Sequence, residues 1–371
     1  MVMNNHKITF GGIDSSAYGV YISGSDTFSA PERDVQYVQV AGRNGDLIID
    51  NGRWNNITVT YPAFIPNTFE SNVDAFRAAM MLKTGYHRLE DTYHPNEYRM
   101  ASFSYGLNPS NITAYRRFGE FALTFNCKPQ RFLKSGETPL QFFPVLVSST
   151  TWYSPYVPVN GTLKFTATTS STLTVTLYTY NSGGTQQSST NYSCANGAEK
   201  TKTFTSNDKY WRLAITGRSS TDTCYFTVVG NTTIDGKTVA MNAKLGRNFT
   251  ITNPTGYPAK PLIEFYNKSL ANMAVDNYKD NVKEEWYSFR SNQMANGANH
   301  GFLNCDLQYL YDSTGANQTD KLVLTTAQAI AHSMVFPEFT GDTIQLQMYD
   351  ITSSIDDGCG LIQIYPNWWT L

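Results

Sequence analysis

Short runs in which apolar and polar residues alternate with a period of two recur along this chain and limit its fold more than any other feature. In a strand, successive side chains point to opposite faces, so this alternation predicts strands with one buried and one exposed face. The 24 Tyr and 21 Phe residues fit that prediction, because aromatic side chains favour strands over helices. We therefore predict a mainly β protein.

The clearest hairpin signal lies in residues 35–64, where three apolar runs are separated by Asn44-Gly45 and Asn51-Gly52. An Asn-Gly pair favours a tight turn because both residues tolerate a positive φ. The segment therefore predicts two successive hairpins.

Residues 67–85 predict the one clear helix of the chain. Asn67 or Thr68 is a suitable N-cap, and Gly85 follows the end of the apolar pattern. The side chains expected to pack on the sheet recur at helical spacing, and they are Phe69, Val73, Phe76 and Met80.

Changes in composition divide the chain into three parts. Residues 1–135 have an ordinary balance of charge, whereas 20 of the 43 residues in 148–190 are Ser or Thr. We predict an N-terminal domain over 1–135 and a β-sandwich over 148–237. This inserted sandwich interrupts a C-terminal β-sandwich, which is therefore discontinuous and comprises residues 136–147 and 238–371. Insertion of this kind is tolerated where the exposed chain ends of the host domain lie close together.

Five alternating runs support a sandwich in the inserted block. They are separated by Gly, Asn and Ser turns at regular spacing, which is typical of an all-β domain. These runs are residues 161–169, 171–180, 200–205, 209–217 and 222–230.

The charge balance argues against a partner that is recognised by its charge. With 28 Lys and Arg against 30 Asp and Glu, the net charge is −2, so no long-range field attracts nucleic acid or an anionic membrane. The start of the sequence lacks the pattern of a secretory leader, so we expect a protein made in the cytosol without a membrane span.

The cysteines predict no metal site and no disulfide framework. They are widely scattered and never in Cys-x-x-Cys spacing, so buried reduced thiols are expected. The five residues are Cys127, Cys194, Cys224, Cys305 and Cys359.

The titratable residues do not favour an enzyme. No GxGxxG, Walker A, GxSxG or HExxH motif is present. Titratable groups crowd together only at Glu90-Asp91, near His87 and His94. We interpret residues 88–99 as a charged loop, because Pro95 and Asn96 mark a turn and a metal site would need better-spaced ligands. We expect no catalytic residue, metal or cofactor.

Aromatic residues in the Ser/Thr-rich block are the one binding signal. Exposed rings beside hydroxyl and amide groups suit a sugar, which needs ring stacking and hydrogen bonds. Alternatively, some of these rings are simply core. The candidates are Trp152, Tyr153, Tyr156, Tyr178, Tyr180, Tyr192, Tyr210 and Trp211.

Several uncommon strings in both outer parts of the chain resemble one known family. They include ITFGGIDSSAYGVYISG, the RNGDL hairpin, GEFALTFNCKPQRFLKSGE, NPTGYPAKPLIEFY and the terminal IYPNWWTL. In this order they are similar to the distal tail protein (Dit) of siphophages and prophages of Gram-positive bacteria, over residues 1–143 and 245–371.

The resemblance implies a virion structural protein at the tail tip. Six copies would form a ring between the tail tube protein and the tail-associated lysin or tail fibre hub, near the receptor-binding proteins. The N-terminal domain would make the ring, and a galectin-like C-terminal sandwich would project from it. The inserted block distinguishes this chain from the short form of the family, and insertions in longer members resemble carbohydrate-binding modules, which implies binding of host cell-wall polysaccharide.

Charged residues of the N-terminal domain are candidates for pairing between ring subunits. The alternative is a solvated surface, where such pairs contribute only ~0–1 kcal/mol each. The candidates are Arg33, Arg43, Asp46, Arg53, Arg116 and Arg117. A carbohydrate-binding adhesin or lectin without a ring-forming role remains the second interpretation of the whole chain.

Overall fold

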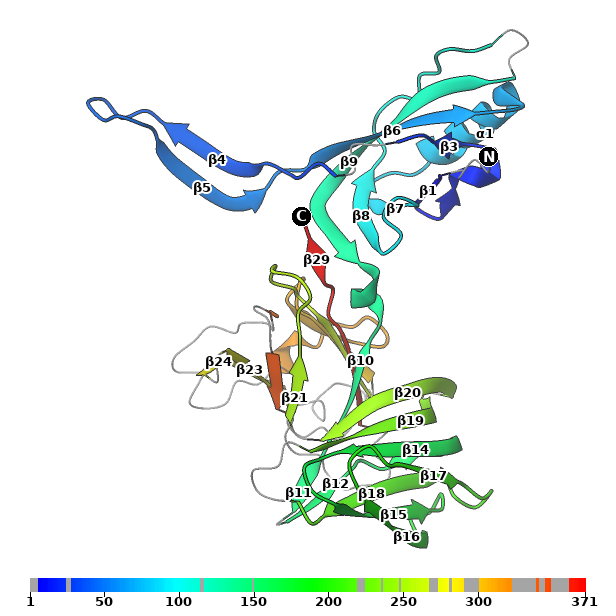
Figure 1. Cartoon of the computed structure of the whole chain (residues 1–371), viewed down its shortest axis with the longest axis vertical. Helices are drawn as coiled ribbons and strands as arrows, with labels where there is room; N and C mark the ends of the chain where they lie inside the picture. The colour runs from blue at the N-terminus through cyan, green and yellow to red at the C-terminus, as the bar shows by residue number, and fades with distance from the viewer. Residues whose placement is uncertain are drawn as a thin grey trace. The chain divides into compact units, whose positions relative to one another are not determined.

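The structure is a computed structural model that divides into two compact units (Figure 1). It describes residues 6–24, 28–113, 117–148, 150–218, 224–234, 236–246, 249–266, 300–320, 338–339 and 360–371, and the backbone alone of 248, 273–279, 282–289, 321 and 344–347. Unit 1 comprises Met1–Gly136 and Trp368–Leu371, and unit 2 comprises Glu137–Asn367. Strands dominate both units, which confirms the prediction of a mainly β protein.

Within the described residues of unit 1, eight strands form one sheet in the order β2-β1-β7-β8-β9-β6-β3, with β29 also pairing with β9. The strands are β1 (Ile8–Phe10), β2 (Ile13–Asp14), β3 (Tyr21–Ile22), β6 (Ile57–Ile65), β7 (His87–Asp91), β8 (Glu97–Ser102), β9 (Gly119–Leu133) and β29 (Trp369–Thr370).

Helix α1 (Phe69–Met81) contributes to the core of unit 1 as the sequence predicts. Its buried side chains are the four predicted ones, and they cluster with β6 residues such as Val59 and Tyr61. Thr68 is the N-cap, but its φ is 52° and its side chain makes no capping hydrogen bond. Packing of the apolar face therefore stabilises the helix more than its cap does.

Two further strands, β4 (Arg33–Val38) and β5 (Leu47–Trp54), form a hairpin whose tip contains Asn44-Gly45, as predicted. The second predicted hairpin is wrong. Asn51 and Gly52 lie inside β5, where the pairing register shifts, and β6 pairs with β9 and β3 instead of β5. Gly52 has a φ of 71°, and a β-bulge accommodates this conformation as well as a turn does.

Unit 2 contains the larger of the described sheets, with nine strands in the order β17-β14-β19-β20-β10-β28-β22-β25-β26. These strands are β10 (Leu140–Pro144), β14 (Asn160–Thr168), β17 (Glu199–Thr203), β19 (Tyr225–Ile234), β20 (Lys237–Gly246), β22 (Leu262–Tyr266), β25 (His300–Asn304), β26 (Tyr309–Asp312) and β28 (Leu361–Tyr365).

A second sheet of unit 2 has six described strands, β11-β12-β18-β15-β16 with β13 beside β18. They are β11 (Leu146–Ser148), β12 (Thr151–Tyr153), β13 (Val157–Pro158), β15 (Leu173–Tyr180), β16 (Gln186–Cys194) and β18 (Tyr210–Thr216). Two described pairs of strands complete the unit. These are β21 (Asn248–Ile251) with β27 (Ile344–Gln347), and β23 (Met273–Lys279) with β24 (Val282–Phe289).

The nine-stranded sheet contributes to hydrophobic contacts on both of its faces. Strand β10 runs parallel to β20, with Phe143 opposite Leu245, and both side chains join the core formed with the six-stranded sheet. The adjacent Phe142 points to the other face and contacts Phe249 of β21, with ring centroids 4.7 Å apart. The Ser/Thr-rich block therefore shares a sheet with the rest of unit 2.

This division differs from the predicted one at the C-terminus. Trp369 and Thr370 pair with Phe132 and Arg131 of β9, so the last four residues belong to unit 1 and not to the C-terminal sandwich. The Ser/Thr-rich block is likewise not divided from unit 2, because its strands continue the nine-stranded sheet. Its predicted limits, 148–237, stay a prediction.

Four of the five cysteines are buried free thiols, as predicted, and Cys359 lies outside the described residues. Among the helices that the structure describes, none is long and apolar enough to cross a membrane.

Candidate functional site

The hairpin of β4 and β5, here called the hairpin arm (residues 33–54), exposes apolar side chains. Figure 1 shows it extending away from the sheet of unit 1. Tyr37 and Ile48 lie directly opposite each other and are 62% and 58% exposed. The remaining exposed apolar side chains of the arm are Val40, Leu47 and Ile49. A paired strand with so many uncovered apolar side chains is typical of an interaction surface.

The charged groups at the base of the arm pair within the chain. Arg33 Nε lies 2.6 Å from an Asp50 carboxylate oxygen, and Arg53 Nε lies 2.6 Å from one of Asp34. Hydrogen bonds from Arg53 and Asn51 lower the pKa of Asp34. These contacts stabilise the bulged part of the hairpin, so Arg33 and Arg53 already have partners without a second subunit.

The other residues predicted at the contact between ring subunits are exposed or lie outside the described residues. Arg43 and Asp46 lie exposed at the tip of the arm, and Arg117 is exposed just before β9. Arg116 lies outside the described residues. Their role between subunits stays a prediction.

Five of the predicted aromatic residues gather on the outer side of the six-stranded sheet, which we call the tyrosine–arginine face. Tyr178 of β15 lies opposite Arg212 of β18, and Tyr180 lies opposite Tyr210. Each is only partly buried, because their neighbours Thr179 and Trp211 take the core side of the same strands. The face consists of Tyr153, Tyr156, Tyr178, Tyr180, Tyr210 and Arg212.

Arg212 contacts several residues at this face. Its guanidinium carbon lies 4.6 Å from the ring centroids of both Tyr153 and Tyr156. Its Nε donates to the Ser154 carbonyl at 3.1 Å, and its Nη1 donates to the Tyr156 hydroxyl at 3.0 Å. The Tyr156 ring meets Tyr180 edge-on at 5.0 Å. Burial, together with Tyr156, raises the pKa of Tyr180 to about 12.

Polar side chains of β16 border the same face. Exposed Ser189 lies opposite Tyr178, and exposed Asn191 accepts a hydrogen bond from Thr176 at 2.8 Å. The arrangement offers ring surfaces, hydroxyls, an amide and a guanidinium on one side of a sheet.

Three predicted aromatic residues do not belong to this face. Trp152 and Trp211 are 4% and 1% exposed, and Trp211 packs edge-on against Phe143. Tyr192 packs on the core side against Phe165, at 5.2 Å. Their rings fill the core because they occupy the inward positions of alternating strands. Arg212, which the prediction missed, lies on the outward side as Tyr210 does.

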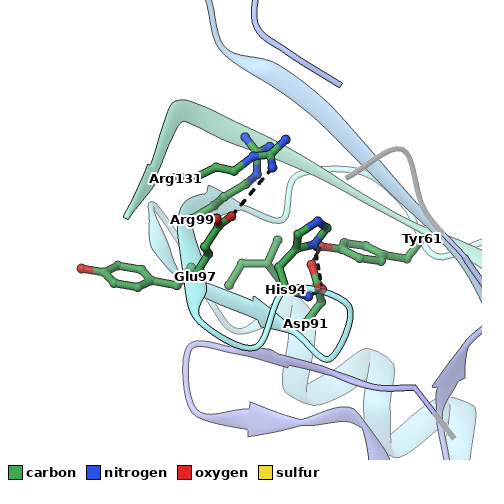
Figure 2. A pocket seen from close by; sticks show the side chains of 8 residues that line it. Tyr61, Asp91, His94, Glu97, Arg99 and Arg131 are labelled. Atoms are coloured by element: carbon green, nitrogen blue, oxygen red, sulfur yellow. Dashed lines mark hydrogen bonds and ion pairs between the residues drawn. The ribbon is translucent and has the colours of Figure 1, made fainter. Parts of the chain in front are cut away.

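The segment predicted as a charged loop contributes to a pocket in unit 1, which Figure 2 shows. Asp91 accepts hydrogen bonds from the backbone of His94 at 2.8 Å and from the Tyr61 hydroxyl at 2.8 Å. Arg99 and Arg131 lie side by side at its other end. Among the described residues no group of His, Cys, Asp or Glu is placed to hold a metal ion.

No protein-family model matches the sequence, and no curated protein matches it. Among solved structures, the crystal structure of the Dit protein of phage SPP1, described as a paradigm of the hub adsorption apparatus in phages infecting Gram-positive bacteria, aligns over 99% of both chains. The TM-score is 0.50 at 8% sequence identity. The chain has the fold of a phage distal tail protein.

The family resemblance in the sequence is thus confirmed at the level of the distal tail protein fold, which spans the whole chain including the Ser/Thr-rich block. Two structures of the phage p2 baseplate in its activated conformation, with Sr and with Ca, align over 97% of both chains. Their TM-scores are 0.37 and 0.38, each at 8% identity.

Proposed function

We propose that this chain is a structural hub of a phage tail tip. Six copies form a ring that joins the tail tube to the tail-associated lysin or fibre hub. The role is assembly, with no turnover and no cofactor. It takes place in the virion, after synthesis in the cytoplasm of the bacterial host.

The hairpin arm is the observation that supports this function best. Isolated two-stranded hairpins are only marginally stable in water, and this one also leaves Tyr37 and Ile48 uncovered. Contact with a neighbouring copy would bury those side chains and order the arm. A ring needs such a heterologous contact, in which one surface of each subunit meets a different surface of the next.

The near-neutral charge of −2 fits the same function. DNA leaves through the tail, and each phosphate neutralised by Lys or Arg would favour its retention. A subunit without a strongly basic surface suits a passage for DNA.

The mass of the purified full chain, measured by light scattering and followed by negative-stain imaging, tests the hub. We expect particles of six times the mass of one chain. Ile48→Asp on the arm should prevent their formation, because burying a carboxylate at an apolar contact is costly. Val229→Asp in unit 2, at a side chain that is 41% exposed, is the matched control and should leave the ring intact.

Two results would contradict this assignment. A wild-type chain that stays monomeric at every concentration would argue against self-assembly. An Ile48→Asp variant that forms the same ring as the wild type would exclude the arm from the contact.

For the tyrosine–arginine face we propose binding of a cell-wall saccharide. Partly exposed tyrosine rings next to Ser189 and Asn191 supply the apolar faces and hydrogen-bonding groups that a sugar needs. Each face would bind weakly, and six copies in one ring would multiply the affinity through avidity.

A glycan array probed with the full chain tests this second function. Replacing both Tyr178 and Tyr180 by Ala should lower binding about tenfold or more, because stacking on two rings is lost. Tyr105→Ala, at an exposed tyrosine of unit 1, is the control that should bind normally. An array that stays silent with the wild type would remove the saccharide function while leaving the hub function untouched.

A further inference from the structure

We propose that Asn44, at the tip of the hairpin arm, is a site of spontaneous deamidation in the folded chain. The backbone nitrogen of Gly45 attacks the side chain of Asn44, and water then completes the conversion to aspartate or isoaspartate. This inference is independent of the hub and saccharide functions, because it rests on the local contacts of the Asn-Gly pairs alone.

An Asn-Gly pair offers this reaction little steric hindrance. Glycine has no Cβ, so its backbone nitrogen can approach the side-chain amide of the preceding asparagine. The part of the chain that the structure describes holds four such pairs, and they differ in their hydrogen bonds. The pairs are Asn44-Gly45, Asn51-Gly52, Asn160-Gly161 and Asn196-Gly197.

The pair within β5 is held at both reacting groups. Asn51 Nδ2 donates to Asp34 Oδ1 at 3.1 Å, which fixes the side-chain amide. The Gly52 N–H donates to Asp50 Oδ1 at 2.8 Å. This carboxylate also opposes loss of the Gly52 proton, because a second negative charge would form beside it. Attack by Gly52 therefore requires the breaking of both hydrogen bonds.

The two pairs in the Ser/Thr-rich block are held as well. Asn160 Nδ2 lies 3.1 and 3.2 Å from two threonine hydroxyls. Asn196 Oδ1 accepts from the Thr169 N–H at 3.2 Å, and the Gly197 N–H donates to the Ala167 carbonyl at 2.9 Å. Hydrogen bonding thus restrains the side chain of each asparagine.

The pair at the tip of the arm has no comparable restraint. Residues 39–46, which connect β4 to β5 in Figure 1, are all exposed. The Arg43 N–H donates to the Val40 carbonyl at 3.2 Å, but no hydrogen bond joins Asn44 or Gly45 to another described residue. Exposed loop tips are also where chains are least ordered. The Asn44 amide can therefore rotate toward the Gly45 nitrogen.

The reaction needs water as its only co-reactant. The Gly45 nitrogen loses its proton and bonds to Cγ of Asn44, while the Cγ–Nδ2 bond breaks and Nδ2 leaves as ammonia. Water opens the resulting succinimide at Cγ to give aspartate, or at the backbone carbonyl carbon to give isoaspartate. Nothing is oxidised or reduced. Because the new carboxyl group is ionised at neutral pH, the product gains one negative charge on a chain of net charge −2.

Peptide mapping by mass spectrometry tests the site after incubation of the full chain at mildly alkaline pH, which favours loss of the Gly45 proton. We expect Asn44 to deamidate about tenfold faster than Asn51 or Asn196, whose hydrogen bonds must open first. In urea these bonds are lost, so all four pairs should react at similar rates. Equal rates in the folded chain would overturn the proposal, as would a difference that persists unchanged in urea.

The proposed ring covers part of the arm, so the wild type is compared with the Ile48→Asp chain. Deamidation of Asn44 in both chains supports the site. Deamidation in the Ile48→Asp chain alone also supports it, and indicates that contact between copies shields the tip. An Asn44 that stays intact in both chains would overturn the proposal and leave the hub function untouched.

Variants connect the rates to the hydrogen bonds. Asp50→Ala removes the acceptor of the Gly52 N–H and should raise the rate at Asn51 about threefold or more. Asp74→Ala removes a carboxylate from an exposed position on α1 and should leave that rate unchanged. Asn44→Gln should remove the product assigned to the tip. An unchanged rate at Asn51 in the Asp50→Ala chain would show that hydrogen bonding does not separate the pairs.

Discussion

Both polar atoms of the Gln141 side-chain amide form hydrogen bonds with the backbone of β20, the strand that follows the Ser/Thr-rich block. Its side-chain oxygen accepts from the Asn242 N–H at 2.7 Å, and its side-chain nitrogen donates to the Ala240 carbonyl at 2.9 Å. These contacts fasten β10 to β20, the parallel pair at which the block leaves and rejoins the sheet.

Gln141→Ala should therefore lower the free energy of unfolding of unit 2 by about 1–2 kcal/mol, because two hydrogen bonds are lost at one position. Urea unfolding followed by fluorescence measures this change. Gln36→Ala, on an exposed position of the hairpin arm, is the control and should change the stability by less than about 0.5 kcal/mol. Equal effects of the two substitutions would argue against the role of Gln141.

Glu264 predicts a dependence of stability on pH. Burial raises the pKa of its carboxyl group, but hydrogen bonds from His300, Tyr266 and Tyr365 outweigh burial, so the pKa lies below its ordinary value. The contribution is fully present above the unfolded pKa, about 4.3, and is lost as the pH falls through the lower folded pKa. We expect stability to decrease below about pH 5.

Glu264→Gln should make unfolding less sensitive to acid and should cost about 1–3 kcal/mol near neutral pH, where a carboxylate accepts better than an amide. Thermal unfolding between neutral and acidic pH measures both effects. Glu32→Gln, at an exposed position, serves as the control. A Glu264→Gln profile that runs parallel to the wild-type profile would contradict the prediction.

Gly119 begins β9 where the first residue of α1 packs against it. A Cβ at this position would lie 2.3 Å from the Phe69 ring, which is 3% exposed. Gly119→Ala should therefore cost about 1–3 kcal/mol through overpacking. Gly106→Ala is the matched control, because its Cβ would come no closer than 3.7 Å to Asn108. Calorimetry compares the two variants, and a Gly119→Ala variant as stable as the control would show that Phe69 can move freely.

We expect lysine to be a poor replacement for Arg212, because the Arg212 guanidinium lies over the rings of Tyr153 and Tyr156. Arg212→Lys loses the planar group between Tyr153 and Tyr156 and the fork of donors to Ser154 and Tyr156. We expect a loss of about 1–2 kcal/mol in the stability of unit 2 by urea unfolding. Arg53→Lys, 74% exposed on the arm, should be nearly neutral. A neutral Arg212→Lys would mean that charge alone matters at this position.

The limits of prediction from sequence are clearest at the two Asn-Gly pairs. Asn44-Gly45 forms the tip of the arm, whereas Asn51-Gly52 lies within a bulged strand, although both are the same dipeptide. Both positions supply the positive φ that the sequence indicates. Whether this conformation produces a hairpin turn or a β-bulge depends on the strand with which β6 pairs. That strand is β9, which is distant in the sequence.

Strand β16 (Gln186–Cys194) shows a second limit. Its mostly polar sequence lacks the alternation that marked its neighbours, so it was not among the predicted strands. It forms because β15 offers a ladder of backbone groups, with Leu173 opposite Cys194 at one end. Pairing with an existing strand can therefore replace an apolar pattern of its own.

By itself, the sequence determined the β character of the chain, helix α1 with its four buried residues, the tip of the arm, and the placement of Tyr178 and Tyr180 on one face of the same strand. These follow from periodicity and turn chemistry, which act over a few residues. Only the tertiary structure decided that one sheet contributes to cores on both faces, that Trp369 returns to β9, and that Arg99 lies opposite Arg131. Such pairings join residues that are distant in sequence, and their stability depends on the packing of whole sheets and not on any local pattern.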